Sequence, residues 1–267
     1  MGDFDPDAFD IDEVNKALRS GRSLGEYDEE VVENFLEFAG EPFTMEKLFE
    51  ETGIDPTDEH AAGVRTAIWG DDDLVLDQDK AFPRNYVLKN ASILIRPDAF
   101  EIEQGDVDRY FGLMTDDGIP LADLDDYPEE EGEGEAVRLM VWDLSPLYRT
   151  CQFEPGGAVL IKPLDIDSRK FEVKYFSPQK LENKRPRIEQ AGAQFLEILR
   201  EVLQRDIPFT SITHQLLYAY YEFGKKHGWE LPLPDLDALL KQAPHITAFT
   251  PETGPKRLRL TTDPHST

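Results

Sequence analysis

The chain has a single cysteine, Cys151, among its 267 residues. One cysteine excludes an intramolecular disulfide and a zinc site made of several thiolates from one chain. A free cysteine usually packs as a small apolar side chain, so we expect Cys151 to be buried. No apolar run reaches the roughly 18 residues that cross a bilayer, and the acidic beginning "MGDFDPDAFDIDE" lacks the features of a signal peptide. These absences favour a soluble, cytoplasmic protein with no membrane partner.

Basic residues are scarce: 28 lysines and arginines face 55 aspartates and glutamates, which gives a net charge of -27. The imbalance is uneven, because residues 1–182 hold 45 acids and 17 bases, whereas residues 183–267 hold 10 acids and 11 bases. An acidic surface repels phosphate backbones, so we expect any contact with an anion in the C-terminal third. Adaptation to high salt would give the same acidity, and the sequence leaves both explanations open.

Common catalytic and metal-binding motifs are also missing. The five histidines show no H-x-H or H-E-x-x-H spacing, and no P-loop, dinucleotide glycine pattern or G-x-S-x-G turn is present. We therefore predict no catalytic residue, no metal ligand and no cofactor. His214 is expected to be a satisfied helix histidine. Asp165 and Asp167 begin like a calcium loop, but the glycine at its sixth position is absent, so we expect a turn there.

The hydrophobic pattern predicts an α+β protein made of four consecutive parts. Short alternating segments such as "SILIRP", "RYFGLM", "VRLMVWDL" and "KFEVKYF" predict a central antiparallel β barrel or sandwich. Within it, the charged residues 125–135 are expected to form a loop. The four parts are an acidic arm (1–27), a mainly helical part (28–90), the β-rich part (91–182) and a helical part that ends in a β-hairpin (183–267).

Residues 28–90 contain helical periodicity over 28–39, 44–53 and 57–70, followed by the strand-like "DLVLD" and "NYVLK". This order of elements resembles the winged helix-turn-helix superfamily. The resemblance implies that the third helix would enter the major groove, with basic residues on helix and wing holding phosphates. Residues 28–90, however, contain 17 acids and only five bases, which favours a protein partner over DNA. The candidate docking residues on this helix and wing are Arg65, Trp69, Lys80 and Arg84.

The C-terminal part repeats a similar order, which suggests a second winged-helix-like unit. Helical stripes are predicted from Ile188 to Asp206, from Ser211 to Gly228 and in "DLDALLKQA", and a hairpin follows around residues 251–254. Two basic clusters are candidates for contact with an anion or a partner. They are Lys184, Arg185 and Arg187 in a linker, and Lys256, Arg257 and Arg259 on the hairpin. Solvated surface charges are the favoured explanation for both.

The leading hypothesis is a non-enzymatic interaction or regulatory protein, whose modules dock another protein or a copy of the chain. One alternative is a DNA-binding regulator that uses the C-terminal hairpin, and another is an acidic mimic of nucleic acid. A third is an enzyme with its pocket in the β-rich part, near Trp142 and Tyr148. For Trp142 and Asp143, strand packing and a turn-capping carboxylate are the favoured roles.

Overall fold

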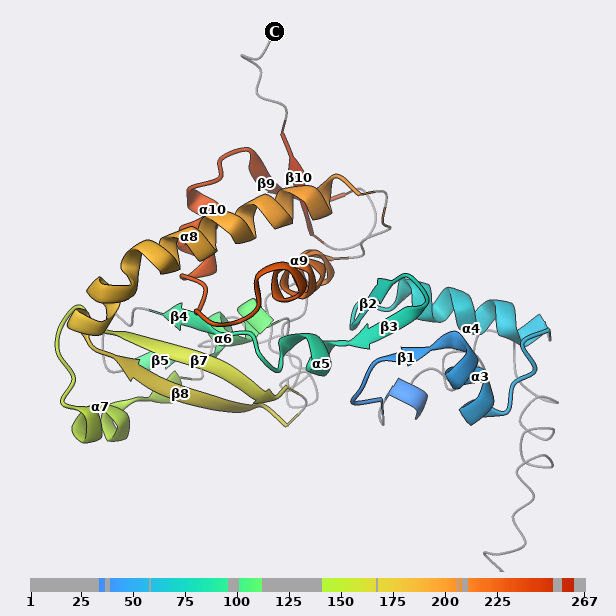
Figure 1. Ribbon diagram of the computed structural model, residues 1–267, viewed down its shortest axis with the longest axis horizontal. Coiled ribbons are helices and arrows are strands. Elements are labelled where there is room, and N and C mark those ends of the chain that lie inside the picture. The colour runs from blue at the N-terminus through green and yellow to red at the C-terminus, as the bar shows by residue number, and fades with distance from the viewer. Residues whose placement is uncertain are drawn as a thin grey trace, which may run out of the picture. The chain divides into compact units, whose positions relative to one another are not determined.

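The structure is a computed structural model, which describes residues 34–36, 39–57, 59–95, 101–111, 141–166, 168–205, 207, 211–251 and 256–261 (Figure 1). The predicted arm (1–27) and the predicted loop (125–135) lie outside these ranges. Helices alternate with small antiparallel sheets, which confirms the α+β class. Residues group into two compact units: unit 1 holds the described residues up to Asp71 together with Leu76–Pro83, and unit 2 holds Asp72–Val75 and the residues from Arg84 onward. None of the helices in the described ranges is both long and apolar enough to cross a membrane.

The described residues between 39 and 83 form two helices and one small sheet. Thr44 caps the first of these helices, because its hydroxyl accepts a hydrogen bond from the backbone N–H of Lys47, and Gly53 ends it at a φ of 68°. Both ends agree with the prediction, and residues 34–36, within the predicted first helix, are also helical. The sheet has the order β1-β3-β2. The elements are β1 (Phe43–Thr44), α3 (Met45–Thr52), α4 (Glu59–Gly70), β2 (Leu74–Asp77) and β3 (Lys80–Pro83).

The predicted second wing strand "NYVLK" is wrong, because Arg84–Leu88 form helix α5. The strand after the turn is β3, which ends at Pro83, where proline has no N–H to continue a ladder. The buried Val87 and Leu88 belong to α5, which packs against helix α9 (Ile212–His227). Tertiary packing decides the state of this short segment, since its apolar residues fit either a strand or a helix.

The described residues of the predicted central barrel or sandwich form two small sheets. A three-stranded antiparallel sheet has the order β4-β7-β8, and a two-stranded sheet pairs β5 with β6. None of the sheets in the described ranges is closed into a barrel, so that prediction is wrong. The predicted strand "RYFGLM" is also wrong at its beginning, because its first three residues lie in a helix. The elements are β4 (Ile93–Ile95), β5 (Glu101–Glu103), α6 (Gln104–Phe111), β6 (Val141–Asp143), α7 (Ser145–Cys151), β7 (Ala158–Asp165) and β8 (Lys170–Phe176).

The turn between β7 and β8 shows the predicted turn chemistry. The carboxylate of Asp165 accepts hydrogen bonds from the backbone and the hydroxyl of Ser168, and Arg169 has a φ of 48°. Of the two aspartates of the rejected calcium loop, Asp165 thus closes the turn, while Asp167 lies outside the described residues.

The described residues from Pro178 onward form three helices and a hairpin. Ser211 caps α9 and Gly228 ends it, as predicted. The last two strands pair antiparallel from Arg257 with Phe249 to Leu260 with Ile246, which confirms the predicted hairpin. The elements are α8 (Pro178–Leu203), α9, α10 (Leu236–Lys241), β9 (Ile246–Phe249) and β10 (Arg257–Leu260).

Buried apolar side chains of α8 and of the three-stranded sheet form one cluster of the core of unit 2. The first half of α8 covers one face of that sheet, and α9 packs along α8. A parallel bridge adds the segment before α10 to the edge of β4, since Leu94 donates to the carbonyl of Leu233 and Leu233 donates to that of Ser92. The cluster consists of Leu94, Ala158, Leu160, Phe176, Leu181 and Ile188.

Candidate functional site: a groove between α8 and α10

The first predicted basic cluster lies on a helix and not in a linker. Lys184, Arg185 and Arg187 all belong to α8, whose N-cap is Ser177. Arg185 forms an ion pair with Glu182, and Arg187 lies 3.4 Å from the carboxylate of Glu230. Two of the three cations are therefore engaged with acids of the same unit.

The second predicted cluster lies on β10. Leu258 is buried and Arg259 is exposed, as an amphipathic strand requires. The guanidinium of Arg259 lies 4.9 Å from the ring centre of Phe249. The hairpin lies over the C-terminal half of α8 in Figure 1, whereas the first cluster belongs to the N-terminal half of that helix. The two clusters are therefore separate surfaces.

The four candidate wing residues have different environments. Arg65 stays within unit 1, where it stacks 4.8 Å from the ring centre of Phe49 and donates to the carbonyl of Pro56. Trp69 is 61% exposed on α4, and Lys80 is exposed on β3. Arg84 is not on the wing: it begins α5 in unit 2.

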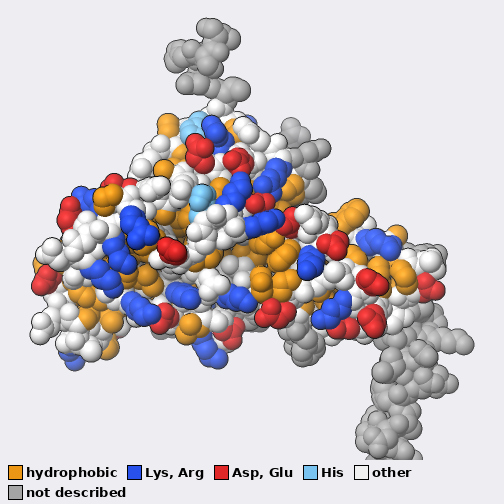
Figure 2. Space-filling view, in the orientation of Figure 1, with side chains coloured by type: hydrophobic (Ala, Val, Ile, Leu, Met, Phe, Trp, Pro, Cys, Tyr) orange, Lys and Arg blue, Asp and Glu red, His pale blue; other side chains and the backbone are white. Residues whose placement is uncertain are grey.

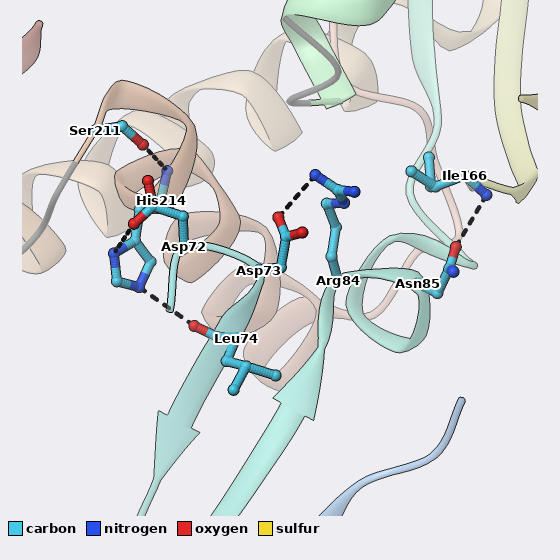
Figure 3. Close-up of polar contacts among 8 residues, drawn as sticks. All are labelled: Asp72, Asp73, Leu74, Arg84, Asn85, Ile166, Ser211 and His214. Atoms are coloured by element: carbon cyan, nitrogen blue, oxygen red, sulfur yellow. Dashed lines mark hydrogen bonds and ion pairs between the residues drawn. The ribbon is translucent and has the colours of Figure 1, made fainter. Parts of the chain in front are cut away.

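Arg84 holds a structural ion pair. Its guanidinium lies 2.7 Å from Asp73, and its side chain is only 13% exposed. Figure 3 shows this pair beside Asn85, whose side-chain oxygen accepts a hydrogen bond from the backbone N–H of Ile166. Arg84 is thus mostly buried and holds an ion pair within unit 2.

Aromatic packing surrounds Trp142 and Tyr148, the residues of the alternative enzyme pocket. The Trp142 ring lies 5.3 Å from that of Phe171, and the buried Tyr148 ring lies 4.0 Å from that of Phe153. Asp143 accepts a hydrogen bond from the backbone N–H of Ser145, and its hydrogen bonds with Ser145 lower its carboxyl pKa. Strand packing and turn capping are confirmed for these residues.

Cys151 lies in the same region, on α7. It is half-buried, whereas the sequence predicted a buried side chain. Its sulfur lies 2.8 Å from the carbonyl oxygen of Leu147, one helical turn earlier. The thiol is thus engaged with the backbone of its own helix.

His214 is buried on α9, near residues that match a catalytic triad in composition (Figure 3). The Ser211 hydroxyl, however, accepts from the backbone N–H of His214 as a helix cap. Ring atom Nε2 lies 3.2 Å from the carbonyl oxygen of Leu74, and Nδ1 lies 3.6 Å from Asp72. A carbonyl only accepts, so the neutral ring carries its proton on Nε2. That proton therefore points to a carbonyl, whereas a catalytic triad needs an Nε2 that accepts from the serine hydroxyl.

Burial lowers the pKa of His214 below its ordinary value. The hydrogen bond to the Leu74 carbonyl and the charge of Asp73 act in the opposite direction and offset burial only in part. A neutral histidine that joins α9 to the beginning of β2 is a structural residue, as the sequence predicted.

A groove of about 510 Å³ opens between α8, α10 and the edge of the three-stranded sheet. Its floor is apolar and includes Leu94, Ala158, Leu181 and Ile188, members of the core cluster. Leu181, Arg185 and Ile188 follow one another at helical spacing, so α8 presents a continuous stripe to the groove. The remaining lining residues come from α6, α8 and the α10 segment: Tyr110, Glu189, Pro234, Asp235, Asp237, Ala238, Leu239, Lys241 and Gln242.

One hydrogen bond fixes the polar wall of this groove. The hydroxyl of the buried Tyr110 donates to Asp235 at 3.0 Å, and the same carboxylate caps α10 by accepting from the backbone N–H of Ala238. The carbonyl of Tyr110 in turn accepts from the hydroxyl of Tyr220 on α9. Burial raises the pKa of Tyr220 well above its ordinary value, so this hydroxyl keeps its proton and donates.

Close packing at Gly192 sets the distance between α8 and the α10 segment. A Cβ atom at this position would lie 2.7 Å from a methyl carbon of Leu239 and 2.9 Å from Cγ of Pro234. Glycine thus allows the two walls to approach at one end of the groove.

Most of the groove was not predicted from the sequence. Arg185 was the only candidate among its lining residues. Tyr110 and Asp235 are 125 positions apart, and no local pattern relates them. One signal was available for Tyr110: Val107, Tyr110 and Phe111 have helical spacing and are all buried, which identifies the inward face of α6.

The described residues contain no group of three or more His, Cys, Asp or Glu side chains placed to hold a metal ion. Comparisons with protein-family models, with curated proteins and with solved structures each found no match.

Proposed function

We propose that this chain is a protein-interaction protein and that the groove between α8 and α10 binds a segment of another protein. The observation that carries this proposal is the combination of an apolar floor with a charged rim. Arg185 and Lys241 carry positive charge on the rim, whereas Glu189 and Asp237 carry negative charge. Apolar stripes beside a polar rim are typical of surfaces that accept an amphipathic peptide.

A protein segment fits the groove better than a small substrate does. Small-molecule sites need polar groups that converge on the ligand. Here Tyr110 and Asp235 bond to each other, and Arg185 pairs with Glu182. These polar groups therefore shape the walls, and more of the exposed lining is apolar than polar.

The first part of the chain fits the same proposal as a winged-helix-like scaffold. Support comes from α3 and α4, from the strands β2 and β3 that follow them, and from the exposed Trp69. We also propose that the acidic charge of residues 28–90 directs this scaffold toward proteins and away from DNA.

Site-specific photocrosslinking in cells tests the groove. A photoreactive residue is placed at Gln242, which is exposed and lines the groove, and in a second variant at Gln204, which is exposed at the end of α8. We expect one protein to be crosslinked from position 242 and not from position 204. Mass spectrometry identifies it, and the purified partner is then titrated calorimetrically against the chain.

The matched variant is Ala238→Arg, which places a long side chain into the groove from an exposed position of α10. This variant should have the melting temperature of the unaltered chain. Its affinity for the purified partner should be at least about tenfold lower, since an unpaired charge would face the apolar floor. Equal crosslinking from both positions, or unchanged affinity of Ala238→Arg, would contradict the proposal. A crosslinked adduct with a second copy of the chain would show that the groove mediates self-association instead of binding another protein.

A further inference from the structure

Residues 168–187 carry a net positive charge, opposite in sign to that of the whole chain. They contain seven lysines and arginines and two glutamates, a net charge of +5 in a protein whose total is -27. The boundary at residue 182 between the acidic and the near-neutral part of the chain falls inside this basic segment. In the structure the segment covers β8 and the first turns of α8.

Three lysines share one face of the three-stranded sheet. Strand alternation places Lys170 and Lys174 on the same side of β8 as Phe176. The register pairs Lys162 of β7 with Glu172, which adds a third lysine to that side. Glu172 lies on the same side, between Lys170 and Lys174, and forms an ion pair with Lys174 at 2.8 Å. This is the face on which α8 begins, since Phe176 packs with Leu181 in the core cluster.

Two lysines of α8 continue the same surface. Lys180 and Lys184 are one helical turn apart, and their ammonium groups lie 3.9 and 5.9 Å from the ring centre of Phe176. Figure 2 shows basic side chains gathered over this region of α8 and the sheet. We call the five residues Lys162, Lys170, Lys174, Lys180 and Lys184 the lysine track.

Prevention of strand aggregation explains only part of the track. β8 is an edge strand of the described sheet, and lysines on an edge discourage pairing with other strands. That role covers Lys170 and Lys174. It does not cover Lys162, which is on the central strand, or the two helix lysines over Phe176.

The track has the dimensions of a phosphate backbone. The six-residue step along β8 from Lys170 to Phe176 extends about 20 Å, and it ends beside Lys180 and Lys184, whose ammonium groups lie near the Phe176 ring. Each strand of a duplex carries a phosphate for about every 3.4 Å of axis, so a linear row of this length meets several phosphates. Lysine supplies a point charge that binds phosphate without reading bases.

We propose that the lysine track binds the phosphate backbone of a nucleic acid, independently of its sequence. This site is separate from the groove and goes beyond the proposed protein partner. It also differs from the predicted hairpin cluster, which lies toward the other end of α8.

Fluorescence anisotropy of the full chain with a labelled 20-base-pair duplex, titrated at several salt concentrations, tests this proposal. For about four neutralised phosphates, the logarithm of affinity should fall with the logarithm of salt with a slope of about -3.6. Two duplexes of unrelated sequence should bind equally. A labelled single-stranded RNA of the same length is measured in parallel, for which about four neutralised phosphates give a slope of about -2.8. Binding of either nucleic acid with its expected slope supports the site.

The track variant is the double substitution Lys174→Gln and Lys180→Gln, both at exposed positions. It should weaken binding at least about tenfold at low salt and reduce the steepness of the slope by about 1.8. The matched control is Lys225→Gln with Lys226→Gln, two exposed lysines at the end of α9. A second control, Lys256→Gln with Arg259→Gln, removes charge from the hairpin.

Both controls should retain the affinity of the unaltered chain, and circular dichroism should show all variants folded. The proposal is overturned if neither nucleic acid binds at low salt, or if a control loses as much affinity as the track variant. Tighter binding of labelled polyglutamate than of DNA or RNA would also overturn it, and would assign the track to an acidic protein.

Discussion

The phenol of Tyr110 donates a hydrogen bond to the carboxylate of Asp235 at 3.0 Å, across 125 positions of the chain. Tyr110 comes from α6, and Asp235 is the N-cap of α10. One contact therefore joins two segments, distant in the sequence, that both line the groove.

Tyr110→Phe removes this hydrogen bond and leaves the ring in place. We expect the free energy of unfolding to fall by about 1 kcal/mol, the usual net value of an intramolecular hydrogen bond. Urea denaturation measures the change. Tyr175→Phe is the control, because its hydroxyl bonds to Glu154 at an exposed position where water can replace it. An equal loss of unfolding free energy in both variants would contradict a larger contribution from the groove hydrogen bond.

Gln215→Leu should have a larger effect. The side-chain amide of Gln215 donates to the carbonyl of Leu258 at 2.9 Å and accepts from its N–H at 2.7 Å, and all of these groups are buried. The variant leaves two backbone groups of β10 without these partners, which costs about 2 to 4 kcal/mol. Urea denaturation is again suitable, with the exposed Gln190→Leu of α8 as control. A loss no larger than that of the control would contradict this role.

His214 makes stability depend on pH. Its pKa is lowered in the folded state, so between that value and 6.5 the unfolded chain binds more protons than the folded chain. Its contribution is therefore complete above pH 6.5 and is lost as the pH falls through this window. Chemical denaturation from pH 7.5 to 5.5 should show a shallower decline for His214→Gln than for the exposed His227→Gln. Parallel curves for the two variants would exclude this assignment.

Gly192→Ala should separate the two walls of the groove. Its Cβ would lie well inside contact distance of Leu239 and Pro234, and overpacking of this kind costs about 1 to 3 kcal/mol. Gly70→Ala is the matched control, because no atom lies within 4 Å of its added Cβ and alanine favours a helix. Thermal unfolding should show a lower melting temperature for the first variant and an unchanged or higher one for the second. An unchanged melting temperature of Gly192→Ala would show that α10 moves away from α8 at little cost in free energy.

Helix ends and the C-terminal hairpin were predictable because their signals are local. Thr44 and Ser211 each accept from a backbone N–H three residues ahead, and Gly53 adopts the left-handed conformation that glycine permits. The structural role of His214 was also correctly predicted. Helix caps and the hairpin depend on residues near one another in the chain, and a sequence displays such relations directly, whereas Leu74, the partner of His214, lies 140 positions away.

The state of short apolar segments was not predictable in the same way. Arg84–Leu88 and Gln104–Phe111 are helices, although both contain residues that were expected in strands. Segments of this length fit either state, and packing against α9 supplies the free energy that decides. The predicted barrel failed for a related reason, since part of one of its assumed strands is the helix α6.

The sequence by itself determined the acidity of the chain, its α+β class, the caps of its helices and the charge reversal over residues 168–187. Only the tertiary structure decided that Lys162 joins Lys174 and Lys180 on one face, and that Tyr110 meets Asp235. The physical reason is that charge and capping are properties of single residues or near neighbours. A groove or a track arises only when helix and sheet packing brings distant residues within a few ångströms.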